Sequence, residues 1–131
     1  MEHETKKELS AYRFESAAEC IAAAKVLFSI EIYKGAVNRA YYAVFNAMRS
    51  VLALDGIDRK RHSGVISEFR RLYIRTAIFD ESLSDTISEA FRLRVGGDYE
   101  DYYVISKDEV ADLITDAEVF VQAVKEYLAT V

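Results

Sequence analysis

The chain contains no proline in 131 residues. Proline is the residue that most reliably interrupts a helix, so long helices are allowed throughout the sequence. Apolar residues recur at intervals of three and four, which is the spacing of one face of an α-helix. The sequence therefore predicts an all-α fold, an antiparallel, up-and-down bundle of about five helices.

The first half of the chain predicts two long helices, over residues 6–29 and 32–54. The second is apolar on nearly every side and ends at Asp55-Gly56, where glycine permits a turn. A helix that is apolar all round is buried all round. We therefore expect residues 32–54 to lie at the centre of the bundle or against a second subunit.

Three more helices are expected in the second half. One follows His62-Ser63-Gly64 and runs to about residue 78. The next carries Phe91 on its apolar stripe and stops at Gly96-Gly97, where glycine takes the left-handed cap conformation. Ser106 and Glu109 have the spacing of a capping box, which predicts that the last helix begins there.

Composition limits the class of protein. A chain of 131 residues predicts a single domain over residues 1–131, and its one cysteine, Cys20, is expected in the core and has no partner for an intrachain disulfide. The absence of a disulfide pair and of an apolar N-terminal segment favours the cytoplasm. No run of about 18 apolar residues is present, so we expect no membrane role.

Charge limits the kind of nucleic-acid site. The formal net charge of -5 opposes broad attraction to phosphates, so any such site must be local. The densest basic run is 59–62, followed by Arg70, Arg71 and Arg75. The run predicts either a solvated face or a binding patch.

Several catalytic motifs are absent from the sequence. There is no glycine-rich phosphate loop, and no zinc or carboxylate-bridged metal spacing. The only histidines are His3 and His62, which leaves little material for a nucleophile and base pair. We expect neither a metal nor another cofactor.

The remaining polar residues fall into three motifs. They are Asn38-Arg39-x-Tyr41-Tyr42, Lys60-x-His62-Ser63-Gly64 and Arg92-x-Arg94-x-x-x-Asp98-Tyr99. Each has a structural interpretation as well as a functional one. Asn38 and Arg39 suit a buried polar network, Arg94 and Asp98 suit a salt bridge, His62 suits a helix entry, and Tyr41 and Tyr42 suit the core.

These motifs, together with Ala40, Ala43, Val44, Phe45 and the closing Ala117-Glu118-x-Phe120, resemble HEPN-domain proteins over nearly the whole chain. The resemblance implies a helical bundle that forms a homodimer. It also implies a minimal nucleotidyltransferase as partner, in a toxin–antitoxin-like pair. Many members are metal-independent ribonucleases whose signature is an arginine, a short spacer and a histidine.

This chain carries Asp98 or Asp101 where that histidine is expected. Metal-independent RNA cleavage requires a proton acceptor and a proton donor, and imidazole supplies both near neutral pH. An aspartate with a pKa near 4 is ionised at pH 7 and is a poor acid. His62 is the alternative, entering the site from another direction.

Three functions therefore stay open. The first is a nucleotide- or RNA-binding protein that works with the nucleotidyltransferase, with binding residues Asn38, Arg39, Tyr42, Lys60, Arg92, Arg94 and Tyr99. The second is a ribonuclease using Arg94, His62 and Asp98. The third is a purely structural dimer. The resemblance also implies that the partner modifies a tyrosine after the arginine segment, for which the candidates are Tyr99 and Tyr103.

Overall fold

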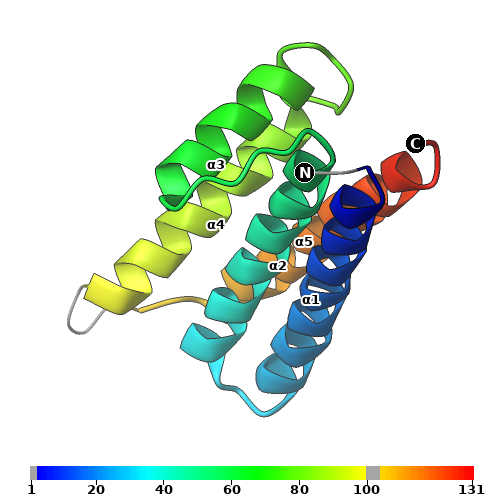
Figure 1. Ribbon diagram of the computed structural model, residues 1–131. Helices are drawn as coiled ribbons and strands as arrows, with labels where there is room; N and C mark the ends of the chain where they lie inside the picture. Colours follow the sequence, from blue (N-terminus) through cyan, green and yellow to red (C-terminus); the bar gives the residue numbers. More distant parts are fainter. Residues whose placement is uncertain (1–2, 100–103) are drawn as a thin grey trace.

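The computed structural model describes residues 3–99 and 104–131, and the side chains of residues 4–97 and 104–131. Its elements in chain order are α1 (His3–Ser29), α2 (Tyr33–Leu54), α3 (His62–Phe69), the π-helical turn η1 (Arg70–Ile74), α4 (Ser82–Tyr99) and α5 (Lys107–Leu128) (Figure 1). The described ranges contain five α-helices and no strand. This confirms the all-α bundle.

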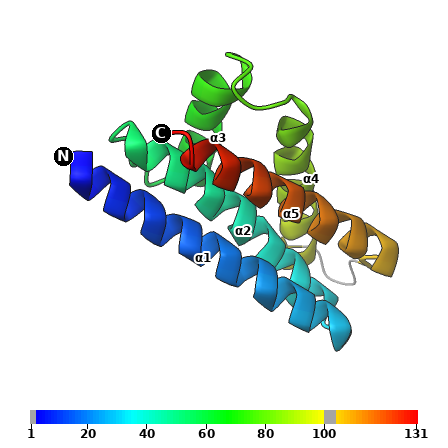
Figure 2. The same cartoon turned by 90° about the vertical axis from the view of Figure 1, so that its right-hand side faces the viewer.

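Helix α2 is the central element. It packs against α1, α3, α4 and α5, and Figure 2 shows α1 and α5 lying along it. Tyr41, Met48 and Leu52 are the largest of its almost completely buried side chains. The expected central position is confirmed. The apolar surface of α2 therefore gives no reason of its own for a second subunit, because the chain buries that helix itself.

The third helix differs from the prediction at both ends. It begins at His62 rather than after Gly64, with Val65 N donating to Arg61 O at 3.2 Å in its first turn. It then widens into η1, where Arg75 N donates to Arg70 O at 2.9 Å, five residues back. Apolar periodicity does not distinguish a π turn from an α turn, so this change was missed.

The prediction that α4 stops at Gly96-Gly97 is wrong. Both glycines are buried and helical, and the helix continues to Tyr99. A glycine inside a helix costs only about 1 kcal/mol relative to alanine, so it permits a helix end without forcing one. Gly56, with a φ of 71°, is the glycine that does take the left-handed conformation, as expected after α2.

Phe91 also differs from the prediction. Its side chain is 43% exposed, and the core position in that turn belongs to Leu93, which is completely buried. The remaining local predictions for the last helix and the cysteine hold. The Ser106 side chain accepts from Glu109 N, the reciprocal bond of the capping box is present, and Cys20 is buried.

A search for membrane spans covered the described part of the chain. None of the helices there combines the length and the apolar character needed to cross a bilayer.

Candidate nucleotide or RNA site

Three helices bring the predicted polar motifs together. Helix α2 contributes Tyr41 and Tyr42, the first residue of α3 contributes His62, and the last turns of α4 contribute Arg94. The Tyr41 hydroxyl lies 2.9 Å from His62 Nδ1. The Phe45 ring packs on the imidazole with 4.2 Å between centroids. His62 is thus held by a hydrogen bond and by aromatic packing.

Arg94 lies over the same two tyrosines. Its guanidinium carbon is 4.8 Å from the Tyr41 ring centroid and 5.4 Å from that of Tyr42. Its Nη2 also donates to the Tyr42 hydroxyl at 3.4 Å. Cation–π contacts of this kind stabilise an arginine on an aromatic surface. We call Tyr41, Tyr42, His62 and Arg94 the central cluster.

Burial and charge set the protonation states in the central cluster. Burial, followed by the positive charges of Arg94 and Arg49, lowers the pKa of His62 below its ordinary value of 6.5. Burial raises the pKa of Tyr41 to about 12. Both side chains are therefore neutral at pH 7. The phenol can donate to Nδ1 when the imidazole proton lies on Nε2.

The second polar motif reaches the cluster through Tyr42. Arg39 lies 5.4 Å from the Tyr42 ring centroid, and its Nη2 donates to Asn38 Oδ1 at 2.9 Å. Arg39 and Arg94 are therefore both placed on one tyrosine ring. The Asn38–Arg39 contact agrees with the expected polar network, and the role of these two residues in binding stays a prediction.

A pocket of about 390 Å³ opens beside the central cluster. It is lined by Tyr42, Phe45, Asn46, Arg49, Asp58, Arg59, Lys60 and His62. Lys60 is a predicted binding residue and Arg59 belongs to the basic run 59–62, whereas Arg49 was not predicted. The signal for Arg49 was available, because Asn38, Tyr42, Phe45 and Arg49 recur at helical spacing on α2.

The loop that carries Lys60 is anchored from two helices. Asp58 Oδ1 accepts from Arg13 Nη2 of α1 at 3.2 Å and from Arg49 Nη2 of α2 at 3.4 Å. The Arg13 side chain is only 8% exposed, and burial lowers its pKa. A buried guanidinium needs a carboxylate, so this contact fixes the loop that leads into His62.

The other predicted residues lie elsewhere or outside the described part. Arg92 forms ion pairs with Glu89 at 2.5 Å and with Glu109 at 3.2 Å, on the exposed side of α4. Asp98 and Tyr99 belong to the backbone of α4, but their side chains lie outside the described residues, as does Tyr103. The expected Arg94–Asp98 ion pair therefore stays a prediction.

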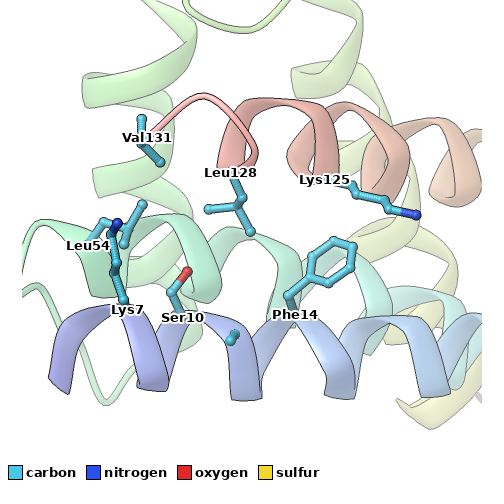
Figure 3. Close-up of a pocket in the computed structure, with 8 residues that line it drawn as sticks. Lys7, Ser10, Phe14, Leu54, Lys125, Leu128 and Val131 are labelled. Atoms are coloured by element: carbon cyan, nitrogen blue, oxygen red, sulfur yellow. The ribbon is translucent and has the colours of Figure 1, made fainter. Parts of the chain in front are cut away.

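A second hollow, of about 290 Å³, lies between α1 and the ends of α2 and α5 (Figure 3). Its labelled lining includes Lys7 and Lys125 around the apolar side chains of Phe14 and Leu128. None of the predicted site residues lines it. Within the described side chains, no group of three His, Cys, Asp or Glu is arranged to hold a metal ion.

Comparison with known proteins identifies the family. The model of the HEPN domain matches residues 10–127. A Methanocaldococcus jannaschii protein named "Putative toxin MJ0142" is 34% identical over 128 residues, covering 98% of this chain and 86% of that protein. A second protein of that organism, named "Putative toxin MJ0605", is 33% identical and covers 87% of this chain and 84% of its own length.

A Thermotoga maritima protein named "UPF0332 protein" is 32% identical, covering 94% of this chain and 93% of that protein. The family model and these relatives each span most of the chain, and they agree with the helical bundle described above. The chain belongs to the HEPN-domain family.

Proposed function

We propose that this protein binds a nucleotide or RNA at the central cluster and its adjoining pocket, as part of a toxin–antitoxin-like system. The observation that carries the proposal is the convergence of Arg39, Arg94 and Lys60 on Tyr42 and His62. Guanidinium groups bind phosphate with forked hydrogen bonds, and aromatic rings stack on bases. Both kinds of group meet here.

The local arrangement agrees with the charge of the chain. A protein with a net charge of -5 does not attract RNA over its whole surface. The pocket nevertheless carries Arg49, Arg59 and Lys60 against the single carboxylate of Asp58. This local positive charge supports a confined site that takes one nucleotide or one short stretch of RNA.

The proposal extends to partners. Two relatives are named "Putative toxin", which supports a toxin–antitoxin-like role. On the family resemblance we further propose a minimal nucleotidyltransferase as the partner protein and a cytoplasmic homodimer as the working form. A partner of that class transfers a nucleotide to a hydroxyl group. Tyr99 and Tyr103 are the candidate acceptors. Intact mass after co-expression with the nucleotidyltransferase, followed by peptide mapping, tests this part of the proposal.

Binding is tested by thermal stabilisation and by affinity for short RNA. A ligand that binds only the folded state raises the unfolding midpoint. We expect Arg94→Ala and Lys60→Ala to weaken binding at least several-fold. Lys25→Ala is the matched control, because Lys25 pairs with Glu118 on an exposed surface and lines neither the pocket nor the cluster. Equal affinity of all three variants and the wild type would contradict the site.

Ribonuclease activity is the second candidate function, favoured by the contact between Tyr41 and His62 beside Arg94. In the tautomer whose Nδ1–H donates to the Tyr41 hydroxyl oxygen, Nε2 of a neutral His62 is able to take the proton of a 2′-hydroxyl group and to return it to the leaving 5′-oxygen, while Arg94 stabilises the charge that develops on the phosphate. The chain thus assembles an arginine and a histidine from separate helices, although the histidine of the family signature is replaced by aspartate.

Cleavage of RNA in the presence of a chelator separates the candidates. A ribonuclease loses activity in both His62→Gln and Arg94→Ala, whereas a binding protein shows ligand-dependent stabilisation without turnover. A purely structural dimer shows neither binding nor cleavage. His3→Gln, which removes the other histidine of the chain, is the control for the assay.

A further inference from the structure

A groove of about 500 Å³, separate from the two hollows described above, lies between α3 and α4. These two helices form a hairpin closed by residues 75–81 (Figures 1 and 2). The groove is lined by Ser63, Ile66, Ser67, Arg70, Arg75, Ile87, Ser88 and Phe91. The lining thus offers two guanidinium groups, three hydroxyl groups and one exposed aromatic ring, without any carboxylate.

The two arginines are available in different ways. Arg70 Nε and Nη2 donate to Ser84 Oγ at 3.0 Å, to Ser84 O at 3.1 Å and to Ser88 Oγ at 2.7 Å. These bonds fix the guanidinium and use three of its five N–H groups. Arg75 is exposed and has no ion-pair partner among the residues that the structure describes. The groove therefore presents one guanidinium held by hydrogen bonds and one that is exposed to solvent.

Asp85 and Glu89 of α4 lie on a different side of that helix from the groove. Ser84, Ser88 and Phe91 follow each other at intervals of four and three and share the face toward the groove. Asp85 and Glu89 line a separate hollow. In an acidic protein, a groove free of carboxylates favours an anionic occupant, and the exposed Phe91 ring favours one that also carries flat, apolar groups.

The groove begins where the central cluster ends. Ser63 directly follows His62 in α3, and the Phe91 ring lies 6.3 Å from the Tyr41 ring, centroid to centroid. From Ser63 to Arg70, the groove extends about 10 Å along α3. An occupant of the central cluster that continued past His62 would enter this groove.

We propose that the groove binds the segment of single-stranded RNA adjacent to the nucleotide at the central cluster. Arg70 and Arg75 bind a backbone phosphate, and Phe91 stacks on a base. This inference rests on the proposed function, because it extends the path of the same ligand. A polyanion that stacks on an aromatic ring accounts for both the charge of the groove and its exposed phenylalanine.

The probe is a 2′-O-methyl oligoribonucleotide of about eight nucleotides, which binds without being cleaved. We expect Phe91→Ala to weaken its binding about 5- to 150-fold, the loss typical of one stacked base. Arg75→Ala should reduce the slope of log affinity against log salt by about 0.7, the value for one phosphate on a single strand. Arg70 is left unchanged because its bonds to Ser84 and Ser88 also join η1 to α4.

Two matched controls address general effects of substitution. Lys25→Ala removes an exposed cation that pairs with Glu118 away from the groove, and Val119→Ala removes an apolar side chain of α5 that is 57% exposed. Both should keep wild-type affinity and salt slope. Circular dichroism and the unfolding midpoint establish that all four variants are folded.

The outcomes separate this inference from the proposed function. Loss of binding in Arg94→Ala, with unchanged binding in Arg75→Ala and Phe91→Ala, contradicts RNA binding in the groove and supports ligand binding at the central cluster. Loss in the groove variants alone supports the groove and contradicts the central cluster. Absence of binding by the wild type overturns both. A change of oligomeric mass in Phe91→Ala without a change in RNA affinity assigns the groove to a protein contact and overturns the inference.

Discussion

His62 is the residue whose surroundings predict the clearest pH effect. Its pKa is lowered in the folded protein, mainly by burial, so the folded state takes up this proton less readily than the unfolded chain. The resulting stability is fully present above pH 6.5 and is lost as the pH falls toward the lowered pKa. We expect the free energy of unfolding in urea to fall between pH 7 and about 5.5.

The control for this effect is the His62→Gln variant, which should lose less stability over the same pH interval. His3→Gln should behave as the wild type does. The carboxylates with lowered pKa, Glu68, Asp80 and Glu109, titrate at more acidic pH and do not contribute in this window. Parallel pH profiles for the wild type and His62→Gln would show that the environment of His62 does not disfavour its charged form.

The sequence predicted some residues of the site better than others. Tyr42, Lys60, His62 and Arg94 were candidates because a polar or aromatic group at that place in a motif is unusual. Tyr41 was assigned to the core, which its burial confirms, yet its hydroxyl also contacts His62. A single side chain can be a core residue and a hydrogen-bonding residue of the site at once. Sequence patterns do not distinguish a buried hydroxyl that has a hydrogen-bond partner from one that has none.

Arg13 and Asp58 show a second limit. They are 45 residues apart, and only the folded chain brings them together. Arg13 lies four residues before the buried Ala17, on the same face of α1, but nothing in the local sequence indicates which carboxylate it meets. Long-range ion pairs of this kind depend on how the helices pack, which periodicity alone does not determine.

The contact of Asp58 with Arg13 predicts how the loop between α2 and α3 is held. We expect Asp58→Asn to lower the free energy of unfolding by about 1 kcal/mol, because it leaves the buried Arg13 guanidinium without a charged acceptor. Asp58 itself is 59% exposed, which keeps the loss modest. The same substitution at the exposed Asp85 is the control. Amide exchange in residues 56–61 should quicken in Asp58→Asn only, and unchanged exchange would contradict the anchoring role.

The number and order of the helices were predicted from the sequence, but only some of their ends were. A capping box specifies a start through two side-chain bonds, so the beginning of α5 could be read from Ser106 and Glu109. Glycine only permits an end, so Gly96-Gly97 was misinterpreted while Gly56 was interpreted correctly. The π turn η1 left no signal, because its side chains keep an apolar pattern that an α-helix would also show.

The two kinds of glycine predict opposite effects of alanine. A Cβ at Gly97 would meet Ile105 at 3.4 Å and Lys34 at 3.7 Å, which are ordinary contacts. Gly97→Ala should therefore raise the free energy of unfolding by up to about 1 kcal/mol, the helix-propensity difference. Gly56 has a φ of 71°, so Gly56→Ala should lower the free energy of unfolding by about 1–2 kcal/mol. Urea unfolding of both variants measures this, and a stabilised Gly56→Ala would contradict the assignment.

At the scale of the whole molecule, α2 decides the architecture. The sequence predicted a helix that is buried on every side, and the chain provides that burial with its own helices. One core joins residues of α1, α2, α3, η1, α4 and α5. A single shared core agrees with the prediction that residues 1–131 form one domain. It also brings the central cluster to the place where α2 meets the start of α3 and the end of α4.

The homodimer is the remaining prediction at this scale. The burial of α2 removes the original physical reason for it, but apolar surface persists at the end of α1, where Val26 of the helix and Ile30 of the turn that follows are 60% and 58% exposed. Exposed apolar side chains at adjacent turns favour association. We expect light scattering to give the mass of two chains, and the unfolding midpoint to rise with protein concentration, because association stabilises the folded state by mass action. A mass of one chain with a midpoint independent of concentration would contradict the dimer and restrict the site to the residues of a single protomer.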